Sequence, residues 1–216
     1  MNIAVSDPHS GQPLLAAGAP LSSAKRAVIL VHGRGAGAAD ILGLAGRFDF
    51  PEVAYLAPQA ANSVWYPHRF MEPTERNEPW LSSALAVLQR LVGELVEAGI
   101  EPERVLLLGF SQGACLASEY AARNPRRYMG IAALSGGLIG DRVDVDRTSG
   151  SLDGTPALFG CSDVDPHIPL ARVKASAEVY RGLGAVVSER IYPGMGHTVN
   201  EDEIAWVRKL IGGPVA

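Results

Sequence analysis

The sequence contains few of the features that mark metal-binding, nucleic-acid-binding or membrane proteins. Only two of its 216 residues are cysteines, Cys115 and Cys161, and neither stands in a spacing typical of metal ligands. The chain has no run of lysine and arginine and a net charge of −4, which makes nucleic acids and anionic membranes poor partners. Its longest apolar runs have the length of a β-strand, so we expect no integral membrane association.

A signal for secretion is also missing from the sequence. Residues 1–7 lack a basic stretch followed by a long apolar one. We therefore expect a cytoplasmic protein whose two cysteines are reduced and buried. Apolar residues make up 47% of the chain and charged residues 19%, which is typical of a globular protein. The length fits a single α/β domain over residues 1–216.

Apolar runs that fit buried strands alternate with helical patterns along the chain. We expect strands at 27–31, 52–57, 104–108, 129–134, 156–160 and 185–191, and helices at 79–98, 112–123, 169–182 and 201–211. This alternation predicts a mostly parallel, doubly wound sheet with helices on both faces. We expect an antiparallel edge strand near residues 13–16 and no large separate cap domain.

Two segments interrupt this alternation. Residues 58–80 are rich in proline, asparagine and aromatic residues, and they follow an expected strand. Because loops at the carboxyl ends of strands form the site in such sheets, we expect this segment to line a substrate pocket. Residues 135–155 are rich in glycine, aspartate and serine, and we expect them to form a surface loop.

The most informative segment is Gly109-Phe110-Ser111-Gln112-Gly113. It follows an apolar strand and leads directly into a helix, and glycines bracket the serine because so tight a turn leaves no room for side chains there. Such a turn presents the serine hydroxyl at the carboxyl edge of a sheet, beside the free N–H groups of the next helix. The pattern predicts that Ser111 is an activated nucleophile.

A serine nucleophile needs a base, and the base needs an acid that orients it. In sheet-based hydrolases the chain order is serine, acid, histidine. Of the five histidines, His197 alone lies in a late loop that leaves a strand and begins the last helix, so it is the candidate base. His9 is expected in a frayed N-terminus. Asp163 and Asp165 both lie in an earlier loop after a buried strand, and the pattern does not decide between them.

The oxyanion of a tetrahedral intermediate needs backbone donors. One is the N–H of Gln112, directly after the nucleophile, and the other is expected in the Gly-rich loop at 31–37. A dinucleotide site is the alternative for that loop, but the loop lacks the full Gly-x-Gly-x-x-Gly register. Gly33, Trp65 and Tyr66 are expected to contact the substrate, with Trp65 as a pocket wall. Packing of Trp65 against the domain is the alternative.

Together, these segments resemble the phospholipase/carboxylesterase family of α/β hydrolases, which includes acyl-protein thioesterases and small bacterial carboxylesterases. The matching segments are Val31-His32-Gly33-Arg34-Gly35, Trp65-Tyr66, Gly109-Phe110-Ser111-Gln112-Gly113-Ala114, Leu134-Ser135-Gly136, Asp165-Pro166-His167-Ile168-Pro169 and Gly194-Met195-Gly196-His197. The resemblance implies the α/β-hydrolase fold and a triad of Ser111, Asp165 and His197. It also implies an oxyanion hole formed by the N–H groups of Arg34 and Gln112.

The sequence departs from the family pattern in two places. Relatives often carry His-Gly before the acid, where this chain has Phe159-Gly160-Cys161. The segment 62–80 also differs from the thioesterase-like members. What the resemblance implies is therefore better supported for hydrolysis of small esters than for removal of acyl groups from proteins.

From these observations we expect a serine hydrolase that cleaves carboxylic esters or thioesters of small or acyl substrates through an acyl-enzyme, without a metal or other cofactor. The expected partner is a small-molecule ester, with a homodimer left open. A dienelactone-type hydrolase on the same scaffold is one alternative, although it would usually carry cysteine at position 111. A non-catalytic binding module is the other, although such a module would have lost members of the triad.

Overall fold

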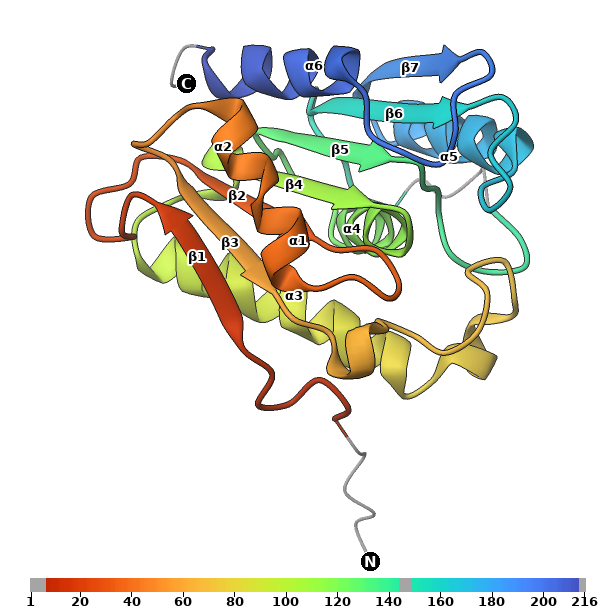
Figure 1. The fold of residues 1–216 in the computed structure, drawn as a ribbon, viewed down its shortest axis with the longest axis horizontal. Helices are drawn as coiled ribbons and strands as arrows, with labels where there is room; N and C mark the ends of the chain where they lie inside the picture. The colour runs from red at the N-terminus through yellow and green to blue at the C-terminus, as the bar shows by residue number, and fades with distance from the viewer. Residues whose placement is uncertain (1–6, 144–148, 214–216) are drawn as a thin grey trace, which may run out of the picture.

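A seven-stranded sheet lies at the centre of the computed structural model, which describes residues 7–143 and 149–213 (Figure 1). The strand order is β1-β3-β2-β4-β5-β6-β7. The strands are β1 (Leu14–Gly18), β2 (Ala27–Val31), β3 (Ala54–Pro58), β4 (Val105–Phe110), β5 (Gly130–Leu134), β6 (Pro156–Ser162) and β7 (Val186–Tyr192). Strand β1 is antiparallel to β3, and the other neighbouring pairs are parallel.

Helices cover both faces of this sheet (Figure 1). The α-helices of the described residues are α1 (Ala38–Leu42), α2 (Leu44–Phe48), α3 (Trp80–Glu97), α4 (Gln112–Arg123), α5 (Leu170–Gly182) and α6 (Glu201–Ile211). Short 3-10 helices are η1 (Ala61–Ser63), η2 (Thr74–Asn77) and η3 (Pro102–Arg104). One core packs under α3, α4 and α5, and the other under α1, α2 and α6. Crossovers between parallel strands are right-handed, and the chain runs along the sheet in both directions from β2, so helices are placed on both faces.

Side chains along each strand enter the two cores in turn. In β2, Val28 and Leu30 belong to the core under α1, α2 and α6, whereas Ile29 belongs to the opposite core. All of β2 is buried, as expected for a central parallel strand covered on both sides. The register places Val31 opposite Gly109. The loop after β2 and the turn after β4 therefore leave the sheet side by side.

The predicted fold class is confirmed, and no separate cap domain is present in the described residues. Each predicted strand and helix is found with its ends within two residues of the predicted ones, and the edge strand is β1. Helices α1 and α2 were not predicted, because five residues are too few to show a helical period. No helix among the described residues is long and apolar enough to cross a membrane.

The expectation of a surface loop at 135–155 is wrong for its first part. Residues 135–140 are buried. The N–H of Leu138 donates to Ser176 Oγ at 2.8 Å, and that of Ile139 donates to Glu119 Oε2 at 3.0 Å. The stretch is thus anchored to both α4 and α5, which its composition did not indicate. Residues 144–148 lie outside the described residues.

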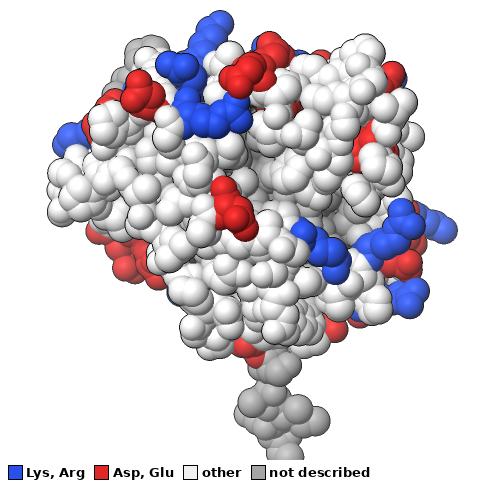
Figure 2. Space-filling model, viewed as in Figure 1, with Lys and Arg blue, Asp and Glu red and all other residues white. Residues whose placement is uncertain are grey.

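Charged side chains of both signs are spread over the face in Figure 2. Lysine and arginine gather near the top of this view and again on its right. The right-hand group lies on the side toward which the parallel strands of Figure 1 point. The carboxyl edge of the sheet is therefore partly basic at its surface.

Candidate active site

Ser111 lies in the tight turn between β4 and α4 and has a strained backbone. Its φ and ψ are 56° and −121°, and such a conformation costs on the order of 1–3 kcal/mol for a residue other than glycine. A Cβ on Gly109 would lie 2.2 Å from the carbonyl oxygen of Gly113, and a Cβ on Gly113 would lie 2.1 Å from that of Val31. The predicted crowding is therefore present: the turn closes against its own helix and against β2.

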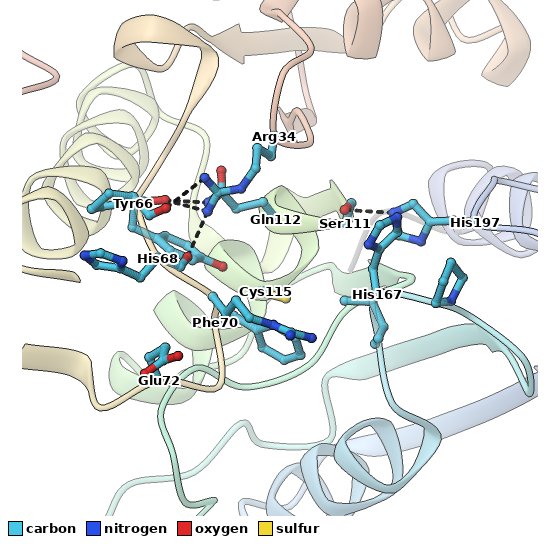
Figure 3. A pocket seen from close by; sticks show the side chains of 14 residues that line it. Arg34, Tyr66, His68, Phe70, Glu72, Ser111, Gln112, Cys115, His167 and His197 are labelled. Carbon is cyan, nitrogen blue, oxygen red and sulfur yellow. Dashed lines mark hydrogen bonds between the residues drawn. The ribbon is translucent and has the colours of Figure 1, made fainter. Parts of the chain in front are cut away.

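Three side chains that are far apart in the sequence meet at the carboxyl edge of the sheet. His197 Nε2 lies 2.8 Å from Ser111 Oγ (Figure 3), and His197 Nδ1 lies 2.7 Å from Asp165 Oδ2. The side chain of Asp165 is fully buried, whereas that of His197 is 18% exposed. The imidazole thus separates the carboxylate from solvent, and its two nitrogens face a hydroxyl and an acid.

Hydrogen-bond donors surround both oxygens of Asp165. Oδ1 accepts from the N–H groups of His167 at 2.8 Å and Ile168 at 3.0 Å, and Oδ2 faces His197. Burial alone would raise the pKa of Asp165, but these donors outweigh it and hold the pKa below its usual value. The carboxylate therefore stays ionised at neutral pH and can hold a proton on Nδ1 of His197.

The imidazole of His197 is also fixed by contacts outside this series. Asp163, the other candidate acid, accepts a hydrogen bond at 2.8 Å from the N–H of Gly194, in the loop that carries His197. The ring of Phe110 lies 4.8 Å from that of His197, and the ring of His167 meets it edge to face at 4.9 Å. Asp163 thus positions the loop, while Asp165 contacts the ring.

The N–H groups of Arg34 and Gln112, predicted as oxyanion donors, lie on two segments that meet at Ser111. Gln112 is the first residue of α4 and follows Ser111 directly. Arg34 follows Gly33, where an added Cβ would lie 3.3 Å from the Cβ of Ser111. Neither N–H makes a hydrogen bond to another described residue. Both remain available to an oxygen atom bound beside Ser111.

The side chains of Arg34 and Gln112 hold the wall of the site, a role that the sequence did not indicate. The guanidinium of Arg34 donates to the carbonyl oxygens of residues 66–68 at 2.8–3.0 Å (Figure 3). Gln112 Nε2 donates to the carbonyl oxygen of Tyr66 at 2.8 Å, and its Oε1 accepts from the N–H of Trp65 at 3.0 Å. The loop after β2, the elbow and the aromatic-rich segment are therefore joined by hydrogen bonds.

A cleft of about 760 Å³ opens beside Ser111 (Figure 3). Residues 66–70 and Glu72 form one side of it, and residues 166–168, which follow Asp165, form part of the other. This stretch of the aromatic-rich segment, which includes Tyr66, therefore lines a cleft, and its contact with substrate stays a prediction. The sequence pattern marked the segment but could not show which of its side chains face inward.

Trp65 does not line this cleft, and its predicted role as a pocket wall is wrong. The indole is fully buried, and its Nε1–H donates to the carbonyl oxygen of His32 at 2.9 Å. Its ring packs against the rings of His9 and His32. The indole N–H thus finds a partner inside the protein, and the side chain anchors the loop to the domain. Gly33 is likewise outside the cleft lining and instead abuts Ser111.

The remaining histidines divide between the interior and the cleft. The expectation that His9 lies in a frayed terminus is wrong, because its ring is buried and Nε2 lies 2.9 Å from the carbonyl oxygen of Trp65. Burial lowers the pKa of both His9 and His32, so both rings are neutral at pH 7. His68 and His167 line the cleft. In residues 7–143 and 149–213, no three histidine, cysteine or acidic side chains are grouped as a metal ion would require.

Comparison with known protein families agrees with this geometry. The family model described as Phospholipase/Carboxylesterase matches residues 16–212, which include Ser111, Asp165 and His197. The chain belongs to the phospholipase/carboxylesterase family. The resemblance indicated by the sequence segments is thereby confirmed.

Relatives within and near this family are named as esterases and thioesterases. An acyl-protein thioesterase 1 from Gibberella zeae is 33% identical over 127 residues, covering 56% of this chain and 54% of that protein. An acyl-protein thioesterase 1 from Kluyveromyces lactis is 30% identical over 168 residues, 73% of each chain. A crystal structure of a phospholipase/carboxylesterase from Dyadobacter fermentans is 42% identical, covers 93% of this chain and 96% of that one, and has a TM-score of 0.89. The chain spans about half the length of the first of these curated relatives.

The departure from the family pattern before the acid leaves the contact between Asp165 and His197 in place. Phe159 is buried and meets the ring of Tyr180 edge to face at 4.9 Å. Cys161 Sγ lies 3.8 Å from Asp165 Oδ2. Burial raises the pKa of Cys161 to about 12, and the charge of Asp165 adds to this effect. The group therefore remains a thiol, a weak donor behind the acid.

Proposed function

We propose that this chain is a serine hydrolase that cleaves carboxylic esters or thioesters of small or acyl substrates. The observation that carries the proposal is the series of hydrogen bonds from Ser111 through His197 to Asp165, which opens on a cleft at the carboxyl edge of the sheet. The names of the thioesterase and carboxylesterase relatives support the same chemistry.

In the first half of the reaction, Ser111 Oγ attacks the carbonyl carbon of the bound ester. His197 Nε2 accepts the hydroxyl proton, and the ionised Asp165 stabilises the imidazolium through Nδ1–H. The π electrons of the carbonyl move to its oxygen, which accepts hydrogen bonds from the N–H groups of Arg34 and Gln112. When the intermediate collapses, Nε2 returns its proton to the leaving oxygen or sulfur, and the alcohol or thiol departs.

In the second half, water replaces the departed alcohol or thiol. His197 Nε2 accepts a proton from the water as its oxygen attacks the acyl carbon. The same two N–H groups bind the second oxyanion. Collapse of this intermediate breaks the bond to Ser111 Oγ, which regains its proton from Nε2, and the carboxylic acid is released.

The test is covalent labelling with a fluorophosphonate probe together with hydrolysis of 4-nitrophenyl acetate. Ser111→Ala should abolish labelling and lower kcat by about 10⁴- to 10⁶-fold, and Asp165→Asn should lower kcat by about 10⁴-fold. Ser23 is an exposed serine far from the cleft, so Ser23→Ala is the matched control and should keep both the labelling and the turnover of the wild type. Labelling or full turnover by folded Ser111→Ala would rule out the proposed nucleophile.

A further inference from the structure

The cleft beside Ser111 holds a positive charge that nothing in the described residues neutralises. Its acidic wall residue, Glu72, is paired with Arg76 at 2.8 Å. Arg34 donates to carbonyl oxygens, which satisfy its N–H groups without cancelling its charge. The exposed side chain of Arg69 makes no ion pair or hydrogen bond with another described residue, although Arg69 lines the cleft.

The negative group of the triad does not offset this charge at the cleft surface. The carboxylate of Asp165 is fully buried behind His197, and hydrogen-bond donors already contact both of its oxygens. The basic group on the right of Figure 2 lies on the side toward which the parallel strands point, with acidic side chains beside it. A cleft with cationic walls concentrates anions and disfavours cations.

A second feature of the cleft is a buried donor without a partner. The side chain of Tyr66 lines the cleft and is 1% exposed, and its hydroxyl has no hydrogen-bond partner among the residues that the structure describes. The hydroxyl lies near Cys115, whose thiol is only a weak hydrogen-bonding group. Burial raises the pKa of Tyr66 well above its usual value, so the group stays a donor throughout the ordinary pH range. An unpaired buried hydroxyl is costly, and an acceptor on a bound substrate would satisfy it.

We propose that the cleft selects esters that carry a second, anionic group, a carboxylate, with Arg69 as the specificity-determining residue. The hydroxyl of Tyr66 donates to an oxygen of the same carboxylate. This inference rests on the proposed function, since it names the substrate class of the same site. The carboxylate can belong to the acyl part or to the alcohol part of the ester, and the experiment separates the two.

The experiment measures kcat/KM for two pairs of esters. The acyl pair is mono(4-nitrophenyl) adipate and its neutral methyl ester, and the alcohol pair is 4-acetoxybenzoate and its methyl ester. Within each pair, the ratio of kcat/KM for the carboxylate to that for the methyl ester is the anion preference. Comparing this ratio between variants cancels the intrinsic difference in reactivity between the two esters.

Arg69→Gln should lower the anion preference of one pair by about three- to ten-fold, because an exposed arginine binds a carboxylate weakly in water and more strongly in a cleft. Arg69→Lys should retain most of the anion preference, and added salt should reduce the anion preference of the wild type. Arg90→Gln, which removes the same charge from the exposed face of α3, should leave both ratios unchanged. Equal anion preferences for the wild type and Arg69→Gln in both pairs would overturn the role of Arg69.

Tyr66→Phe tests the second donor. No hydrogen bond is lost in the free protein, so the free energy of unfolding should not fall, whereas the anion preference of the same pair should fall by about three- to ten-fold. A loss of stability without a change in the ratio would mean that the hydroxyl is structural. Absence of turnover for all four esters would instead contradict the proposed function, which separates the failure of the two proposals.

Discussion

The carboxyl group of Glu203 is buried in the first turn of α6 and has a partner for only one of its oxygens. Oε2 accepts from the N–H of Asn200 at 2.9 Å. Oε1 has no hydrogen-bond partner in the described residues and faces Gly160, where an added Cβ would lie 2.1 Å from it. Burial raises the pKa of Glu203 to about 7, and the charge of Asp202 acts in the same direction. Ionisation of this group should therefore destabilise the folded protein.

The sign and size of this effect on the free energy of unfolding follow from the pKa values of Glu203 in the unfolded and folded states. Because the pKa is raised from 4.5 to about 7, the folded state holds the proton more tightly than the unfolded chain does. The stability is thus fully present below pH 4.5 and falls as the pH rises from there to about 7. At 1.36 kcal/mol for each pKa unit, ionisation costs roughly 3 kcal/mol at pH 8.

Glu203→Gln removes this charge and keeps an acceptor for the N–H of Asn200. We expect the substitution to be more favourable at pH 8 than at pH 5 by about 2.5 kcal/mol in the free energy of unfolding. Urea denaturation followed by tryptophan fluorescence at both pH values measures the difference. Glu201→Gln is the matched control, because Glu201 lies exposed in the same helical turn and pairs with Arg47. An equal effect of Glu203→Gln at the two pH values would refute the reasoning.

Two further substitutions test the packing of the site. Gly113→Ala places a Cβ 2.1 Å from the carbonyl oxygen of Val31, and it should lower both the activity and the free energy of unfolding, the latter by about 3 kcal/mol. The control, Gly93→Ala, adds a Cβ in open space on α3 and should raise the free energy of unfolding by about 0.5–1 kcal/mol. Chemical denaturation compares the two variants, and an unchanged stability of Gly113→Ala would contradict the steric argument. Trp65→Phe leaves the carbonyl of His32 without its donor and should cost about 1–3 kcal/mol, with KM values for 4-nitrophenyl acetate and octanoate changing in parallel. A KM change confined to one chain length, with stability unchanged, would restore Trp65 as a pocket wall.

The sheet and the elbow could be predicted because each leaves a local signature in the sequence. Strands β2 and β4 are continuous apolar runs, as burial on both faces requires. The turn at Ser111 is bracketed by glycines because backbone atoms occupy the space of their side chains. The choice between Asp163 and Asp165 left no such local signature. It depends on which carboxylate reaches His197, and only the family resemblance indicated the answer.

Side-chain direction in the aromatic-rich segment could not be predicted, because distant partners determine it. Trp65 and Tyr66 are adjacent aromatic residues in the sequence, yet Trp65 donates to the carbonyl of His32 inside the protein and Tyr66 lines the cleft. His9 is buried because its ring packs against that of Trp65, which lies 56 residues away along the chain. A pattern of residue types within one segment contains no information on such contacts.

The contacts of Arg34 and Gln112 couple the rate of the proposed reaction to the shape of its cleft. Each residue offers a backbone N–H beside Ser111, and each side chain binds the backbone of residues 65–68. A substrate that displaces this loop must therefore strain the same residues that we propose as oxyanion donors. Because an oxyanion donor acts only within about 3 Å of its acceptor, small displacements of the cleft wall should lower kcat as well as raise KM. We therefore expect specificity and transition-state stabilisation in the proposed reaction to depend on the same hydrogen-bonded unit.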